Sequence, residues 1–250
     1  MSPPTVNSAP VHDADASSSA SSTKRTRSDH LVLRPMTVDD KEEFAALFCK
    51  IFRREPLGQY NGVAPEEGRD IADDATKDPV SFVVEDTTLE KPHRLIAFLT
   101  NCIITEATTA AKQKKVQEEG SVDGVQAILY RMDELWLSNS TVFKTNPNAR
   151  IMKFIALGVD GRYEGLGLAK ELLNASMEMA KKCKCDAVVV VATAFATQHL
   201  FKNRLQFEEM GKVRFAEFVW KKSKSQGGGE ERPFVNLLEP EFSIVLEKKL

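Results

Sequence analysis

A glycine-rich turn joins an apolar segment to an amphipathic segment in the second half of this chain of 250 residues. Residues 151–159 (IMKFIALGV) are almost all apolar, and Gly165 and Gly167 follow shortly after them. Residues 165–183 repeat apolar side chains at helical spacing, which predicts a strand, a tight turn and a helix. Residues 186–192 (DAVVVVA) are typical of a buried parallel strand. A parallel pair joined through a helix requires a sheet with helices packed on it.

The remaining periodicities predict an α+β, or mixed α/β, fold with this parallel crossover in its second half. Further strands are expected over residues 30–36, 80–84, 95–104, 213–220 and 241–247, and further helices over residues 38–53, 65–75, 122–137 and 196–205. Residues 107–120 are polar and are interpreted as a linker. The alternation in residues 241–247 indicates an edge strand that closes the chain. We expect one domain over residues 29–250, preceded by a disordered tail of residues 1–28, which are too poor in apolar side chains to form a core.

Composition excludes several classes of partner. The formal net charge of −2 provides no basic field for nucleic acid. No apolar run approaches the roughly 20 residues of a membrane span, and the N-terminus has no apolar core of a secretory signal, so a cytoplasmic protein is expected. The basic residues 24–27 (KRTR) are interpreted as part of a solvated tail rather than a nuclear address. Cys183 and Cys185 are too closely spaced for a zinc pair, and no metal is expected.

The glycine turn predicts an anion site. The free N–H groups at the start of a helix and the helix dipole favour negative charge, and glycine lets a phosphate approach the backbone closely. A tight connection without a ligand is the alternative. The sequence lacks the G-x-x-x-x-G-K-[ST] pattern of nucleoside triphosphatases and the long βαβαβ context of dinucleotide folds.

The stretch from Leu157 to Ala169 (LGVDGRYEGLGLA) resembles the coenzyme A loop of the GNAT superfamily of N-acetyltransferases, whose pattern is V-x-x-x-Y-[RQ]-G-x-G-[ILV]-[GA]. The matching positions are Val159, Tyr163, Gly165, Gly167, Leu168 and Ala169. The family's Arg or Gln falls on Glu164, a carboxylate where a pyrophosphate would approach. A second register takes Arg162 as the basic residue but loses the match at the Val and Tyr positions. The order of elements over residues 30–250 also resembles that family.

The resemblance implies a GNAT-like central mixed sheet of about seven strands, splayed between strands four and five and flanked by helices. It also implies a helix inserted between strands three and four. Acetyl-CoA is the implied cosubstrate, with its pantetheine arm in the gap between the splayed strands, where a backbone N–H could polarise the thioester carbonyl. The residues implied to contact it are Leu157, Gly158, Val159, Glu164, Gly165, Leu166, Gly167, Leu168 and Ala169.

Residues 52–57 (FRREPL) resemble the E-P-L stretch of invertebrate-type arylalkylamine N-acetyltransferases, in which the glutamate is the proposed base acting through water. The resemblance assigns Glu55 as the catalytic base. Pro56 ends the preceding helix and could fix Glu55 at a cleft, where burial would raise the pKa of its carboxyl. A solvated glutamate at a helix end is the alternative, with Glu134 as another candidate base. Residues 196–202 lack the Tyr that many relatives use as general acid. Its possible substitutes are Thr193, Thr197 and His199.

The implied function is transfer of acetyl from acetyl-CoA to a primary amine, with a small arylalkylamine as the expected acceptor. Acetylation of a polyamine or a protein amine, and a non-catalytic CoA-binding domain, are the alternatives. Trp136 and Met132 on the inserted helix are interpreted either as walls of an aromatic amine site or as core residues. The sequence does not determine an oligomeric state.

Overall fold

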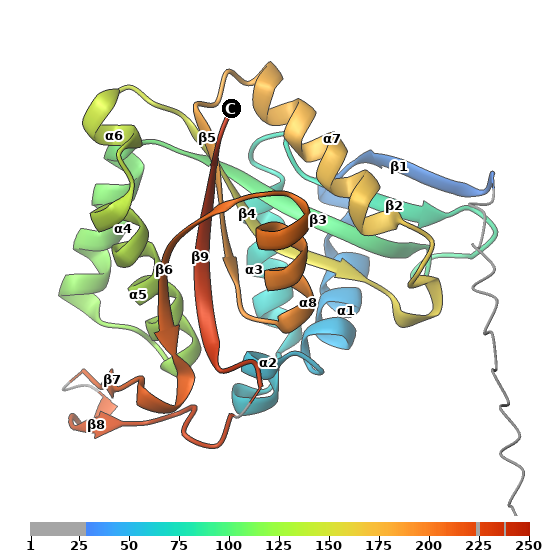
Figure 1. Ribbon diagram of the computed structural model, residues 1–250. Coiled ribbons are helices and arrows are strands. Elements are labelled where there is room, and N and C mark those ends of the chain that lie inside the picture. The colour runs from blue at the N-terminus through green and yellow to red at the C-terminus, as the bar shows by residue number, and fades with distance from the viewer. Residues whose placement is uncertain (1–28, 224–225, 238) are drawn as a thin grey trace, which may run out of the picture.

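A computed structural model describes residues 29–223, 226–237 and 239–250, so the expected tail of residues 1–28 lies outside the described residues. A seven-stranded sheet of order β1-β2-β3-β4-β5-β9-β6 forms its centre (Figure 1). Its strands are β1 (Leu31–Pro35), β2 (Phe82–Asp86), β3 (Leu95–Ile104), β4 (Ile151–Val159), β5 (Ala187–Ala192), β6 (Glu208–Arg214) and β9 (Phe242–Lys249). Strands β4 and β5 pair in parallel, and the other neighbours in this sheet are antiparallel. The expected mixed sheet of about seven strands is confirmed.

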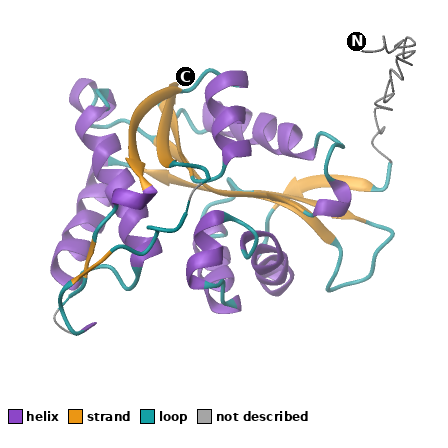
Figure 2. Ribbon diagram, turned by 60° about the horizontal axis from the view of Figure 1, so that its bottom comes forward, coloured by secondary structure: helices purple, strands orange, loops and turns teal. Residues whose placement is uncertain are grey.

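Helices cover both faces of this sheet (Figure 2). The helices are α1 (Lys41–Phe52), α2 (Pro56–Asn61), α3 (Pro65–Ala75), α4 (Glu106–Glu119), α5 (Gly124–Asn139), α6 (Val142–Thr145), α7 (Leu168–Lys182) and α8 (Phe195–Gln198). Shorter or irregular turns of helix are η1 (Val38–Asp40), η2 (Gly161–Tyr163), η3 (His199–Arg204) and η4 (Phe215–Glu217), and β7 (Trp220–Lys221) pairs with β8 (Glu230–Glu231) in a separate ribbon. Within the described ranges, every helix is too short or too polar to cross a membrane.

Two cores form on opposite faces of the sheet because successive strand residues point to opposite sides. On β3, Phe98 packs with Phe44 and Phe48 of α1, whereas Leu99 packs in the core that contains Leu172 of α7. The sheet is thus buried between α1 and α3 on one side and α7 on the other. Alternating apolar residues along β3 therefore fix the position of both helix layers.

The parallel ladder between β4 and β5 is short. It runs from Ile151↔Ala187 to Phe154↔Val190 and then stops, although both strands continue. The register of β3 on β4 passes from Asn101↔Phe154 to Thr100↔Ala156, so Ile155 is an extra residue in a β-bulge. A bulge bends its strand. The expected splay between the fourth and fifth strands is confirmed.

Gly158 lies three residues beyond this bulge and pairs regularly with Phe98. A Cβ at Gly158 would meet Phe98 Cζ at 2.6 Å and Ile51 Cδ1 at 2.9 Å. Glycine is required here because the aromatic ring packs directly on the backbone of β4.

The interpretation of residues 107–120 as a linker is wrong. They belong to α4, whose N-cap Thr105 accepts a hydrogen bond from the Thr108 N–H, and whose C-cap is Gly120 at φ 77°. Thr109 is its buried residue, so α4 has no apolar stripe to reveal it. The insertion between β3 and β4 therefore begins with a polar helix and continues with α5.

Two predictions near the C-terminus are also wrong. Residues 241–247 do not form an edge strand, because β9 lies between β5 and β6. Residues 213–220 do not form one strand, because β6 ends at Arg214 and the chain then turns through η4. Phe215 and Trp220 are thereby buried in one cluster with Phe234 and Ile128, whereas in a continuous strand they would face opposite sides.

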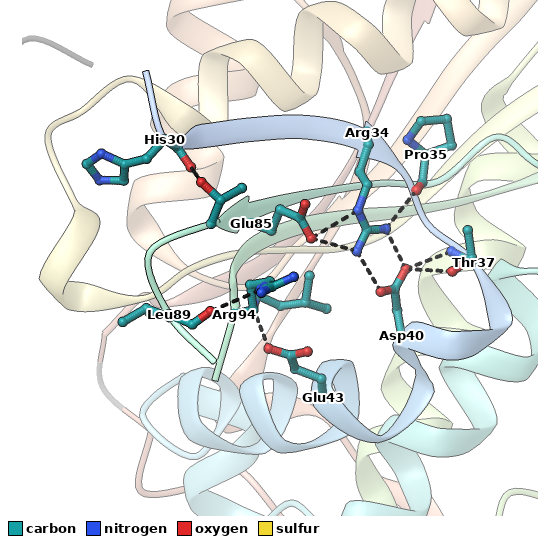
Figure 3. Close-up of polar contacts among 11 residues, drawn as sticks. His30, Arg34, Pro35, Thr37, Asp40, Glu43, Glu85, Leu89 and Arg94 are labelled. Atoms are coloured by element: carbon teal, nitrogen blue, oxygen red, sulfur yellow. Dashed lines mark hydrogen bonds and ion pairs between the residues drawn. The ribbon is translucent and has the colours of Figure 1, made fainter. Parts of the chain in front are cut away.

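Polar contacts tie α1 to the first strands of the sheet (Figure 3). Arg34 of β1 donates to both Asp40 oxygens, at 2.7 and 2.8 Å, and also to Glu85 of β2. Glu43 of α1 accepts the Leu95 N–H at 2.6 Å. The Arg34 guanidinium holds the pKa of the Asp40 carboxyl below its ordinary value despite burial. These contacts fix α1, whose C-terminal end leads directly into Glu55.

Candidate functional site

A cavity of about 270 Å³ lies where β4 and β5 separate. On the side of the gap it is lined by Leu157 of β4, Val190 of β5 and Thr197 of α8. Phe48 and Phe52 of α1 line it from the other side of β4, and their rings stack at 4.4 Å. The cavity thus passes along the splayed end of β4, with apolar walls and a few polar groups, as ligand sites commonly have.

Glu55 lines this cavity from the turn between α1 and α2. Pro56 occupies the first turn of α2, and Glu55 takes the extended N-cap conformation without using its side chain as a cap. In the described part of the chain the Glu55 carboxylate has no hydrogen-bond or ion-pair partner. Burial raises the pKa of this carboxyl above its ordinary value. An unpaired carboxylate with a raised pKa is suited to accept a proton.

A second carboxylate in the cavity, Asp133 of α5, is paired on both oxygens. Its Oδ1 accepts from Lys153 Nζ of β4, and its Oδ2 accepts from Lys112 Nζ of α4 at 3.1 Å. The two ammonium groups hold the pKa of the Asp133 carboxyl below its ordinary value although burial opposes this. The sequence does not reveal these three residues, because no local pattern relates one position on each of two helices and a strand.

The glycine turn has the backbone that its sequence predicts. Gly165 has φ 80°, and Gly167, the N-cap of α7, has φ 82°. Such angles favour glycine, and a Cβ at either position would meet nothing within 4 Å. The outer side of the turn is therefore open beside the first N–H groups of α7, which have no acceptor within the helix. An anion can reach them.

Buried contacts anchor the start of this turn. Asp160 is 3% exposed, and its carboxylate accepts from Lys50 Nζ of α1 at 2.6 Å and from Arg162 Nη2 at 2.9 Å. These cations hold the pKa of the Asp160 carboxyl far below its ordinary value despite burial. The Tyr163 hydroxyl donates to Asp86 at 2.7 Å, and burial with this bond raises the pKa of Tyr163 to about 12. Arg162 is thus engaged with Asp160, which favours the register that aligns Tyr163 with the family pattern.

Glu164, the departure from the family pattern, is exposed. A Cβ on Gly161 would lie 3.7 Å from Glu164 Oε1 and 3.9 Å from Arg54 Nη1, so the two side chains flank the same glycine.

Eight of the nine expected cofactor-binding residues fall into three groups, and the ninth, Gly158, packs against Phe98 and does not line the cavity. Leu157 lines the cavity together with Glu55. Val159, Leu166 and Leu168 pack against one core, in which Leu168 is buried and the other two are partly buried. The remaining positions of the turn do not line the cavity: Glu164, Gly165, Gly167 and Ala169. The turn and the cavity share β4 as their support and are not one pocket.

Other candidates divide between cavity and core. Thr193 and Thr197 line the cavity, whereas His199 is exposed and bonds Asn203 at 2.8 Å. Trp136 and Met132 are core residues rather than cavity walls, and the Trp136 indole donates to buried Glu247. The cavity-lining residues of the same helix are Val125, Leu129 and Asp133. Within the described ranges, no group of three His, Cys, Asp or Glu side chains is arranged to hold a metal ion.

One segment of the chain matches the model of a known protein family. Residues 129–207, from α5 through β4, the glycine turn, α7 and β5, match the family model described as the acetyltransferase (GNAT) family. A search of curated protein sequences finds no significant match.

Solved structures resemble the whole described fold. A mosquito arylalkylamine N-acetyltransferase like 5b superposes with a TM-score of 0.68 at 18% identity, covering 88% of this chain and 100% of that one. Arylalkylamine N-acetyltransferase 2 from Aedes aegypti gives 0.65 at 20% identity, with coverage of 88% and 99%. The Drosophila melanogaster polyamine N-acetyltransferase gives 0.66 at 16% identity, with coverage of 88% and 100%. Residues 129–207 thus match the acetyltransferase (GNAT) family model, and the fold with its splayed sheet resembles the folds of these solved acetyltransferases.

Proposed function

We propose that the protein transfers an acetyl group from acetyl-CoA to a small primary amine, with Glu55 as the general base. One observation carries the proposal. The unpaired, partly buried Glu55 carboxylate lines the cavity that lies at the gap between β4 and β5. A reactive thioester in the gap and an amine beside Glu55 would therefore meet within one cavity.

The residues divide the chemistry between them. The backbone of Gly165 to Ala169 holds the pyrophosphate at the N-terminus of α7. The backbone of Leu157 and Val159, on the edge of β4 that β5 leaves, bonds the pantetheine arm and directs an N–H to the thioester carbonyl oxygen. Acetyl-CoA supplies the activated acyl group, and its thiolate is the leaving group.

Glu55 makes the amine nucleophilic. Alkylamines have a pKa of about 10 and are protonated at neutral pH. Glu55 takes one proton from the ammonium directly or through one water, and the amine nitrogen bonds to the carbonyl carbon. The carbon–sulfur bond then breaks, and the nitrogen gives its second proton through water to the departing thiolate, which leaves the amide and the CoA thiol. Ordinary thiols have a pKa of about 8.5, so the thiolate of CoA can leave without a Tyr donor. Thr193 lines the cavity and can donate a hydrogen bond to the thiolate, whereas the Thr197 hydroxyl already donates to the Ala194 carbonyl oxygen at 2.8 Å.

The stacked rings of Phe48 and Phe52 support an acceptor with an apolar part, such as an arylalkylamine. Acceptors of this kind and polyamines are named for the structurally similar enzymes from insects.

The test follows CoA thiol release by the purified protein with acetyl-CoA and a panel of arylalkylamines, alkylamines and polyamines. We expect thiol release that depends on the amine and saturates with it. Tight acetyl-CoA binding without release for any amine would instead assign a non-catalytic CoA-binding protein.

A further inference from the structure

The two lysines on Asp133 are held very differently. Lys153 belongs to the central strand β4 and its side chain is 14% exposed, so it is a fixed partner of Asp133 Oδ1. Lys112 belongs to the polar helix α4 and its side chain is 52% exposed. Water can solvate an exposed ammonium that leaves its partner. A buried ammonium that leaves its partner has neither water nor an opposite charge to stabilise it. Asp133 Oδ2 is therefore the carboxylate oxygen in this triad whose cation can be exchanged.

The charges along the cavity favour a cation as the replacement. Glu55, Glu67 and Asp123 line it in addition to Asp133, against the two cations Lys112 and Lys153. Burial, and for Glu67 also the nearby carboxylates Asp123 and Asp70, raises the pKa of the Glu55 and Glu67 carboxyls. A substrate ammonium lowers the electrostatic energy of such a cavity, and a substrate carboxylate raises it.

We propose that Asp133 binds a second cationic group of the acceptor, which displaces Lys112 from Asp133 Oδ2. The acceptor amine reacts beside Glu55, the apolar walls contact its alkyl chain, and the distal ammonium or guanidinium pairs with Asp133. The inference rests on the proposed acetyl transfer and refines its acceptor to a diamine or an aminoalkyl guanidine. Lys112 then occupies the place of the substrate cation when no substrate is bound.

The test compares kcat/KM for putrescine and agmatine with that for butylamine, which has one amine and no second cation. Wild type should prefer the dications. Asp133→Asn should lower the ratio of putrescine to butylamine by about tenfold or more, because the neutral amide loses the charge-assisted bond. Lys112→Ala should raise the same ratio by about two- to fivefold, the range expected for an exposed ion pair.

Lys114→Ala is the matched control. It removes a lysine of α4 whose partner, Glu118, also lies on that helix at 3.8 Å, outside the cavity. This variant should leave the ratio unchanged. Since Asp133→Asn could unfold the protein by leaving Lys153 unpaired, its fold is checked by circular dichroism. If Asp133→Asn does not fold, the effect of Lys112→Ala on the ratio of putrescine to butylamine decides between the outcomes.

The outcomes separate the two proposals. Equal use of putrescine and butylamine, or a ratio that Lys112→Ala leaves unchanged, overturns the role of Asp133 while leaving amine acetylation intact. Failure of wild type to acetylate any amine overturns the proposed function. The role of Asp133 would then be overturned with it.

Discussion

Phe154 and Val190 form the last pair of the parallel ladder between β4 and β5, and both side chains line the cavity that begins there. The bulge residue Ile155 follows Phe154 directly and bends β4 away from its neighbour. β5 does not bend with it, because β5 stays paired with β9 as far as Ala192↔Ile244. The interior position of β9 therefore keeps one side of the gap fixed.

The glycine turn offers a test of the proposed pyrophosphate site. Gly167→Asp places a carboxylate at the N-terminus of α7, and acetyl-CoA affinity should fall by at least about tenfold, since like charges in contact cost several kcal/mol. Gly167→Ala carries the same backbone strain at φ 82°, about 1 kcal/mol, without the charge. Calorimetry should show near-normal acetyl-CoA affinity for the alanine variant. Equal acetyl-CoA affinities for both variants would show that the pyrophosphate does not bind at this turn.

Glu164 should weaken coenzyme binding through its charge. Glu164→Arg is expected to strengthen acetyl-CoA binding by about two- to tenfold at low salt, with a smaller gain at high salt because the side chain is exposed. Glu178→Arg is the control, since it inverts an exposed charge near the other end of α7, where it pairs with Lys181. A gain that is the same for both variants would reflect net charge rather than the turn.

The Glu55 carboxylate should reduce the stability of the protein at neutral pH. Its pKa is higher in the folded than in the unfolded chain, so folding favours the protonated form. This contribution to stability is complete below the unfolded pKa, about 4.3, and is lost as the pH rises through the folded value. Glu55→Gln should thus be more stable than wild type at pH 7, and the difference should shrink towards pH 4. Urea unfolding of both proteins at pH 7 and pH 4 measures this difference in the free energy of unfolding. A variant less stable than wild type at pH 7 would indicate a partner for the carboxylate.

Sequence patterns predicted the features that depend on local backbone chemistry. These features include the strands with apolar runs, the crossover helix and the positive-φ glycines Gly165 and Gly167. Apolar periodicity does not reveal the polar helix α4. Its signals are the Thr105 cap, the terminal Gly120 and good helix formers between them, with Lys115 and Glu119 one turn apart.

The Asp133 triad could not be predicted for a different reason. Asp133 follows the core residue Met132 on α5, and Lys153 is one charge in an apolar strand. Their pairing depends on how α5 packs against the sheet, which a single sequence does not express. The same holds for β9, whose alternating pattern fits an edge or an interior strand equally well until its neighbour β6 is placed.

The kcat of Glu55→Gln tests the account most directly. Glutamine keeps the shape of the side chain but cannot accept the amine proton, so kcat should fall by about 10²- to 10⁴-fold, the usual contribution of a general base. Acetyl-CoA affinity should be preserved. Glu66→Gln, on an exposed carboxylate of α3 that pairs with Arg69, should retain wild-type kcat.

The pH profile with the best amine completes this measurement. Wild-type activity should fall at acidic pH as Glu55 becomes protonated, with the midpoint above the ordinary glutamate range because burial raises the pKa of Glu55. In Glu55→Gln this acidic limb should be lost. A folded Glu55→Gln enzyme with wild-type kcat and an unchanged acidic limb would contradict the assignment of Glu55 as the base.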